Sequence, residues 1–148
     1  MLTDALLLLS NAQAVTSTAV STNTIDLGVA RDVGAGEELN VVILVDESAT
    51  ASGSATVTFE LITSASSDLS SPNVISATTA IGKASLTAGR APINLPIPVH
   101  LTQELGQRYF GVRYTVATGP LTAGKFTAQI VGHQMHQQKN YPSGYSVL

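Results

Sequence analysis

The sequence contains no cysteine and no tryptophan, and only 11% of its 148 residues are charged. Without cysteine the chain has no disulfide framework, no thiolate metal ligand and no thiol nucleophile. Aromatic residues make up 5% of the chain, which disfavours the exposed ring platforms that bind sugars or single-stranded nucleic acid. The net charge is −3, so no basic field exists to attract nucleic acid or polyphosphate. The length fits one domain with a single core.

The N-terminal stretch MLTDALLLLSNAQA imitates a secretory signal peptide, because four leucines precede an Ala-Gln-Ala sequence. Asp4 stands where a basic region is expected, and the apolar run is shorter than a signal peptide requires. We therefore predict a short helix or arm with Thr3 or Asp4 as its N-cap. Its leucines could pack on the protein's own core or on a neighbouring molecule. No stretch approaches the length of a transmembrane helix, and no membrane partner is expected.

From Thr24 onward the apolar residues alternate with polar ones, which predicts half-buried β-strands. The segment 39–45 is almost continuously apolar, so we expect a central strand there. Prolines at alternate positions in 91–98 indicate an edge strand, because proline cannot donate a ladder hydrogen bond. The residues expected to point into the core from the two clearest strands are Ala55, Val57, Phe59, Leu61, Phe110, Val112, Tyr114 and Val116.

Seven or eight short strands separated by regular turns predict an all-β protein. The expected fold is a jelly-roll-like antiparallel β-sandwich of about eight strands. We divide the chain into an N-terminal arm or short helix (1–20), the jelly-roll sandwich (21–132) and an extended C-terminal tail (133–148). A further helical turn is considered at 100–105.

The segment GPLTAGKF matches all but the last position of a nucleotide-binding P-loop. A P-loop needs Ser or Thr after the lysine to bind magnesium, and a helix that follows the loop. Here Phe126 follows Lys125, and the next residues alternate as a strand. The tetrapeptide LTAG also occurs twice, at 86–89 and 121–124. We interpret both copies as turns that lead into strands, with the leucine in the core and the glycine at positive φ.

The remaining motifs predict no catalytic, cofactor or metal site. His133 and His136 form an H-x-x-H pair, but no cysteine completes a zinc set. No G-x-S-x-G sequence frames a serine nucleophile, and the carboxylates fall mainly at strand ends. We therefore expect a protein that is not an enzyme.

Several segments of the sequence resemble one protein family over nearly the whole chain. They are DALLLLSNAQAVT (4–16), STNTIDLG (21–28), GAGE (34–37), LTAGR (86–90) and, most specifically, GQRYFGVRYTVATGPLTAGKFTA (106–128). The chain resembles the capsid cement, or decoration, proteins of tailed, mostly short-tailed, double-stranded DNA bacteriophages.

The resemblance implies a jelly-roll protein on the outer surface of an expanded capsid in the virion. Its partner would be a major capsid protein of the HK97-like fold. It would act as a homo-oligomer that staples neighbouring capsomers, with a dimer at two-fold positions as our expectation and a trimer as the alternative. No catalysis, cofactor or direct nucleic-acid contact is implied.

From their position and expected exposure we choose eight residues as candidate contacts with the capsid or with another copy of the chain. They are Leu6, Leu7, Leu8, Leu9, Tyr109, Arg113, Tyr141 and Tyr145. The four leucines among them could equally complete the protein's own core.

The alternative function is a β-sandwich ligand- or carbohydrate-binding module of a phage receptor-binding assembly. Such a module would need a cleft lined by rings or convergent polar groups.

Overall fold

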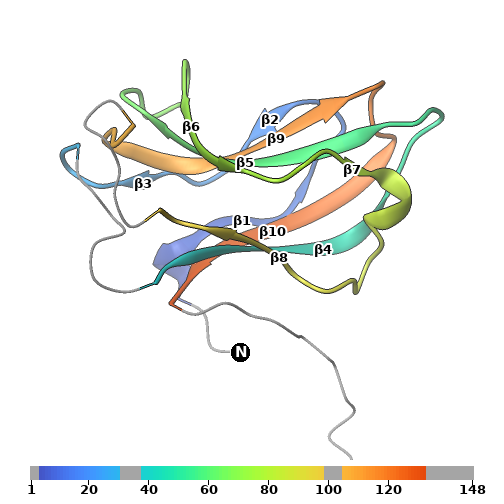
Figure 1. Cartoon of the computed structure of the whole chain (residues 1–148), viewed down its shortest axis with the longest axis horizontal. Coiled ribbons are helices and arrows are strands. Elements are labelled where there is room, and N and C mark those ends of the chain that lie inside the picture. Colours follow the sequence, from blue (N-terminus) through green and yellow to red (C-terminus); the bar gives the residue numbers. More distant parts are fainter. Residues whose placement is uncertain (1–3, 31–37, 99–104, 133–148) are drawn as a thin grey trace, which may run out of the picture.

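The computed structural model describes residues 4–30, 38–98 and 105–132 as two packed β-sheets (Figure 1). Two 3-10 turns, η1 (Ala5–Leu7) and η2 (Lys83–Ser85), are the helical elements among these residues. The strands are β1 (Leu8–Ala14), β2 (Ala19–Val20), β3 (Ile25–Asp26), β4 (Asn40–Thr50), β5 (Thr56–Ser64), β6 (Asn73–Ala77), β7 (Ile81–Gly82), β8 (Ile93–Pro96), β9 (Tyr109–Ala117) and β10 (Ala123–Val131).

The strand order confirms the predicted antiparallel sandwich. One sheet, here called sheet A, has the order β1-β10-β4-β8. The other, sheet B, has the order β2-β9-β5-β6, with β3 also paired to β9 and β7 to β5. When β2 with β3 and β6 with β7 each count as one interrupted strand, eight strands remain, and their order is that of a jelly roll. Every pairing is antiparallel.

The core lies between the two sheets and is built from the inward residues of the alternating strands. At its centre Phe59 of β5 meets Tyr114 of β9 and Phe126 of β10 edge-on, with ring centroids 5.8 and 5.3 Å away. Tyr114 and Phe126 are stacked at 5.7 Å. These arrangements are among those that aromatic pairs prefer. The predicted inward residues are confirmed: seven of the eight are buried, and the eighth, Val116, packs against the core.

A hydroxyl pair crosses this core. The Tyr114 hydroxyl lies 2.5 Å from Ser10 Oγ of β1, and Ser10 Oγ also accepts a hydrogen bond of 3.1 Å from the Ala128 N–H. Burial raises the pKa of Tyr114 to about 12, although the Ser10 hydrogen bond opposes the shift. The bond joins sheet B to the edge strand of sheet A, and it satisfies a polar group that would be costly to bury alone.

The N-terminal region differs from the predicted arm or helix. Asp4 caps the short turn η1, because its Oδ1 accepts a 2.9 Å hydrogen bond from the Leu6 N–H. From Leu8 the chain enters β1, which pairs with β10, so the sandwich begins well before residue 21. Register shifts flank Ser10, and Ala12 has a positive φ of 44°. These irregularities interrupt the period-two pattern and hide the strand from sequence analysis.

The interpretation of the proline-rich segment and of the first LTAG turn is confirmed, as are the buried leucine and the positive-φ glycine of both LTAG copies. The strand β8 lies at the edge of sheet A, with Ile93, Leu95 and Ile97 buried. Leu86 and Leu121 are buried, and Gly89 and Gly124 have φ values of 76° and 153°. The second copy departs from the prediction in one respect, because β10 begins at Ala123, so Ala123 and Gly124 already belong to the strand, at a register shift, and only Leu121 and Thr122 precede it. The residues that follow Lys125 continue this strand and do not form the helix of a P-loop.

The outer face of sheet B is partly covered by the loop between β5 and β6. Leu69 of this loop is 2% exposed although it lies outside the main core cluster. A Cβ atom on Gly111 of β9 would overlap the Leu69 Cδ1 atom and would lie 2.9 Å from Ser21 Oγ. Ser21 Oγ is itself fixed, because it accepts from the Val112 N–H and donates to the Asn23 carbonyl. Glycine at position 111 therefore makes room for the loop.

We predict that Gly111→Ala destabilises the protein by about 1–3 kcal/mol, because the added methyl group must displace Leu69 or Ser21. Urea unfolding followed by circular dichroism measures the change. Gly82→Ala is the matched control, since a Cβ there meets nothing within 4 Å, and it should change stability by less than about 0.5 kcal/mol. Equal stability of the two variants would show that the loop does not pack on Gly111.

Candidate functional site

Within residues 4–30, 38–98 and 105–132, no group of three or more histidine, aspartate or glutamate side chains could hold a metal ion. No helix in this part of the chain is long and apolar enough to cross a membrane. His100, His133 and His136 lie outside the described residues, as do Tyr141 and Tyr145 and most of the turn considered at 100–105. The candidate contacts that can be placed are therefore the N-terminal leucines, Tyr109 and Arg113.

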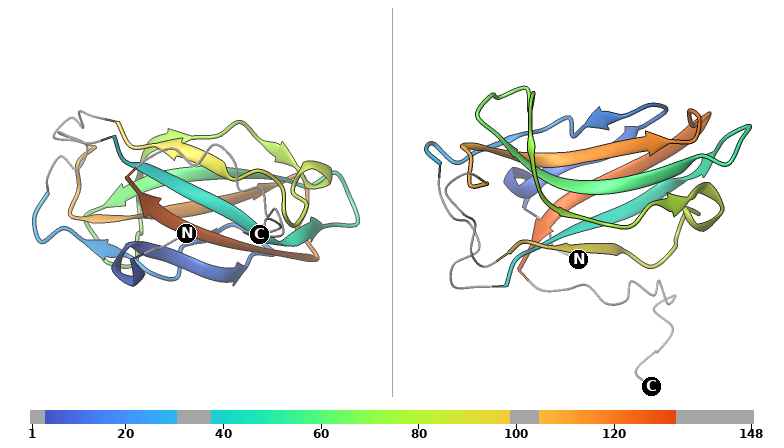
Figure 2. Two further views of the ribbon diagram at one scale, coloured as in Figure 1. Left: turned by 90° about the horizontal axis from the view of Figure 1, so that it is seen from below. Right: turned by 45° about the horizontal axis from the view of Figure 1, so that its top comes forward.

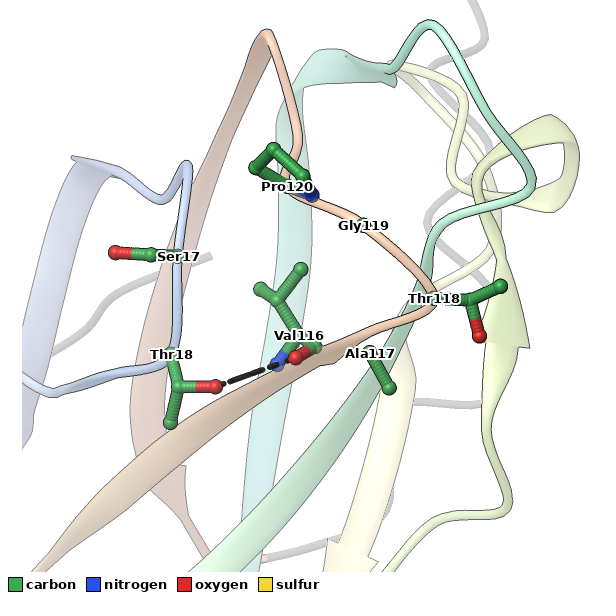
Figure 3. Close-up of a pocket in the computed structure, with 7 residues that line it drawn as sticks. All are labelled: Ser17, Thr18, Val116, Ala117, Thr118, Gly119 and Pro120. Atoms are coloured by element: carbon green, nitrogen blue, oxygen red, sulfur yellow. Dashed lines mark hydrogen bonds between the residues drawn. The ribbon is translucent and has the colours of Figure 1, made fainter.

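One end of the sandwich carries an open depression of about 470 Å³ (Figure 3). Beside the depression, Thr18 fixes the loop between β1 and β2 to β9, because the Thr18 Oγ1 atom accepts a 3.0 Å hydrogen bond from the Val116 N–H. Gly119 and Pro120, the start of the segment that imitates a P-loop, form part of the turn there. The lining offers neither an ionisable group nor an aromatic ring to a ligand. Its residues are Ser17, Thr18, Val116, Ala117, Thr118, Gly119 and Pro120.

The four N-terminal leucines are divided between solvent and core. Leu6 is 83% exposed and Leu7 36% exposed, whereas Leu8 is half-buried and Leu9 is completely buried. The division follows from the backbone, because η1 turns its side chains outward before β1 sends Leu9 inward. Of these four leucines, Leu6 and Leu7 in the turn are therefore the exposed ones, and Leu9 belongs to the protein's own core.

Tyr109 is half-buried and belongs to a small charged cluster that the sequence did not reveal. It opens β9 opposite Asp26 of β3. Both carboxylate oxygens of Asp26 accept from the Arg108 guanidinium, at 2.7 and 2.8 Å. The same guanidinium lies 5.1 Å from the centre of the Tyr109 ring, within the range of a cation–π contact. Tyr109 and Arg108 therefore present one preorganised surface.

The leucine turn and the Arg108–Tyr109 cluster lie at the same end of the sandwich. The Asn23 side chain donates a 3.0 Å hydrogen bond to the Leu8 carbonyl. Two residues later, Ile25 pairs with Phe110 at the start of β9. Through these contacts the link between β2 and β3 connects the start of β1 to the start of β9. Both strand starts lie at the same end of the sandwich in Figure 1. The structure brings these two predicted contact regions together.

Arg113 lies elsewhere, in the middle of the outer face of sheet B, and it is less exposed than expected. Its side chain is 27% exposed and forms a 2.5 Å ion pair with Glu60 of β5. The Thr115 hydroxyl donates to the same carboxylate oxygen at 2.5 Å. Burial alone would raise the pKa of Glu60, but the bonds from Arg113 and Thr115 outweigh it and lower that pKa. Arg113 is therefore mainly a cross-strand partner within the sheet.

The architecture defines an antiparallel jelly-roll sandwich whose accessible features are an apolar turn, a charged cluster and an uncharged depression. The family model named Bbp16 matches residues 9–130, and the chain belongs to this family. The match runs from β1 into the last residues of β10, so it covers the sandwich and leaves out the exposed Leu6 turn. No curated protein matches the chain.

The ion pair between Asp26 and Arg108 leads to a prediction of how the stability of the protein depends on pH. The Arg108 hydrogen bonds, followed by one from the Gly28 N–H, lower the pKa of Asp26 from 3.8 to about 2. A carboxyl whose pKa falls on folding adds stability above its unfolded pKa and loses this contribution as the pH falls toward its folded pKa. The Asp26 contribution should therefore be complete above about pH 4 and should disappear toward pH 2.

NMR titration of the side-chain carboxyl carbons tests this expectation. Arg108→Gln should raise the pKa of Asp26 most of the way back to its ordinary value. Asp68 is the internal control, because the pKa of its carboxyl is lowered chiefly by the Ser70 N–H and should not respond to the substitution. An Asp26 pKa near 3.8 in the unaltered protein would show that the ion pair is absent in solution.

Proposed function

We propose that this protein is a structural virion protein that binds the outer surface of an expanded bacteriophage capsid. It staples neighbouring major capsid proteins and thereby stabilises the shell. The observation that carries the proposal is the resemblance of the sequence to capsid cement proteins, which is most specific in residues 106–128. This block forms β9, the turn after it and most of β10, which are inner strands of the two sheets.

The chemistry of the surface supports a binding role. Interface centres are poor in charge and contain apolar or aromatic anchors, surrounded by a polar rim. At one end of the sandwich, Leu6 and Leu7 supply exposed apolar surface, and Arg108 with Tyr109 supplies an ordered guanidinium and ring. Aromatic and arginine side chains often dominate the binding energy of an interface. This end of the molecule is therefore the proposed capsid contact.

The partner in this proposal is a major capsid protein of the HK97-like fold, and the protein itself acts as a homo-oligomer, a dimer in our preferred version. Each contact can be modest, because linked copies bind the shell multivalently. Binding that exists only on the assembled shell stabilises that shell by linkage. The mechanism needs no catalysis and no cofactor.

We predict that Leu6→Ser weakens binding to expanded capsids by about tenfold or more, since burying one leucine contributes about 1.5–3 kcal/mol and 1.4 kcal/mol is tenfold in affinity. Co-sedimentation of the purified variant with capsids stripped of this protein measures the change. The melting temperature should not change, because Leu6 is 83% exposed.

Val74→Ser is the matched control, because it removes another exposed apolar side chain, 39% exposed, from β6. It should bind as the unaltered protein does. If Leu6→Ser binds equally well, the leucine turn is not the contact. If the unaltered protein fails to sediment with expanded capsids, the proposed function itself is contradicted.

A further inference from the structure

The lysine and arginine side chains that the structure describes divide into two groups. Arg108, Arg113 and Lys125 each form an ion pair with a carboxylate. Within residues 4–30, 38–98 and 105–132, Lys83 and Arg90 form none. A shortage of carboxylates is not the reason, because the chain has ten acidic residues against seven basic ones. Lys83 and Arg90, here called the η2 cations, also lie on one segment, the turn η2 and the loop that follows it.

Backbone carbonyl groups hold both η2 cations in place at a partly exposed surface. The Lys83 ammonium donates to the Ala51 carbonyl. The Arg90 guanidinium donates to the Ser85 and Ala91 carbonyls, at 2.8 and 3.3 Å. A carbonyl orients a cation but carries no net charge, so it leaves the positive charge uncompensated. Because the side chains are already ordered in the free protein, a partner that binds them loses less entropy.

The carboxylates of the adjoining strand do not neutralise the η2 cations. This strand is β4, which contacts η2. Its Glu47 forms a 2.8 Å ion pair with Lys125. Its Asp46 accepts a 2.6 Å hydrogen bond from the Thr127 hydroxyl of β10. The positive charge of the η2 cations is therefore available to another molecule.

The η2 cations lie at the end of the sandwich opposite to the Leu6 turn. The register of sheet B places the start of β5 beside the end of β9, whereas Tyr109 begins β9 at the Leu6 end. The Lys83 N–H donates a 3.1 Å hydrogen bond to the carbonyl of Ala55, directly before β5. In both views of Figure 2 the coil of η2 lies beside the hairpin between β4 and β5. Since β9 has nine residues, its two ends are about 26 Å apart.

The uncharged depression lies at the same end, because residues 117–120 in its lining follow β9 directly. The hairpin between β4 and β5 connects it to the η2 cations. Ala51 of this hairpin accepts the hydrogen bond from Lys83. A Cβ atom on Gly53 would lie 3.8 Å from the Thr118 carbonyl oxygen. An uncharged hollow with fixed charges beside it matches the usual interface, which has a centre poor in charge and a polar rim.

We propose that the η2 cations and the neighbouring depression form a second contact surface, which binds an acidic segment of the capsid protein. Carboxylates of that segment pair with Lys83 and Arg90. Two surfaces at opposite ends of one sandwich allow a single copy to contact two neighbouring capsid proteins, as a staple must. A protein partner is favoured over nucleic acid, because the net charge of −3 repels a polyanion. The proposal rests on the proposed function, since it concerns the same partner.

Co-sedimentation with DNA-free expanded capsids, stripped of this protein, tests the second surface when salt is varied. The double variant Lys83→Gln with Arg90→Gln should bind about 3- to 10-fold more weakly than the unaltered protein at low salt. The difference should vanish at about 1 M salt, because salt screens exposed charges. A mere loosening of the η2 loop would instead weaken binding at every salt concentration, and this result would overturn the proposal.

Two controls separate the surface from general effects of charge. The variant Lys83→Arg with Arg90→Lys keeps both charges and should bind as the unaltered protein does. The variant Val74→Glu with Ala77→Glu changes the net charge by the same two units at exposed positions of β6, and it should also bind normally.

The outcomes distinguish this proposal from the proposed function. If the unaltered protein sediments with the capsids and Lys83→Gln with Arg90→Gln binds equally well at low salt, only the second contact surface is contradicted. The same holds if Val74→Glu with Ala77→Glu weakens binding as much, because net charge would then be the cause. If the unaltered protein does not sediment, both proposals fail.

Discussion

The hydrogen bond between Ser10 and Tyr114 is the interaction on which the arrangement of the molecule depends. It lies beside three packed rings in a core that no disulfide supports, because the chain has no cysteine. It holds the edge strand β1 against the opposite sheet, and β1 in turn fixes where the leucine turn η1 leaves the sandwich. A buried phenol needs such a partner, since an unpaired hydroxyl in the core would cost more than the bond contributes. The position of the proposed contact surface thus follows from one polar pair inside an apolar core.

The sequence predicted those parts of the fold in which one residue decides one geometric feature. Regular alternation placed Phe59 and Tyr114 in the core, and the prolines around β8 marked the edge of a sheet. It failed where irregular backbone interrupts the period, as at the bulges of β1. It also could not show why residue 111 is glycine, because the reason is a loop residue, Leu69, that is distant in the sequence. The ion pair between Arg108 and Asp26 could not be predicted either, because it depends on the register that pairs β3 with β9.

The candidate site shows the same limits. The sequence could not tell exposed Leu6 from buried Leu9, because the four leucines look alike in sequence. Only the step from η1 into β1 separates them. Arg113 looked available for a partner because it alternates outward along its strand. In the structure its guanidinium instead forms an ion pair with Glu60 on the neighbouring strand. The sandwich that matches the Bbp16 family holds the exposed groups at its end in place, and these groups form the contact surface that we propose. Loops and termini on a rigid scaffold are where binding residues are usually found.

Electron cryomicroscopy of purified virions, with and without this protein, tests the proposed function most directly. If the protein is a capsid cement, its jelly-roll density will cover the capsid faces at symmetry-related junctions between capsomers, with the end that carries Leu6 and Tyr109 against the shell, and will vanish when the protein is omitted. Density confined to the tail or fibres, or virions that lack the protein altogether, would contradict the proposal.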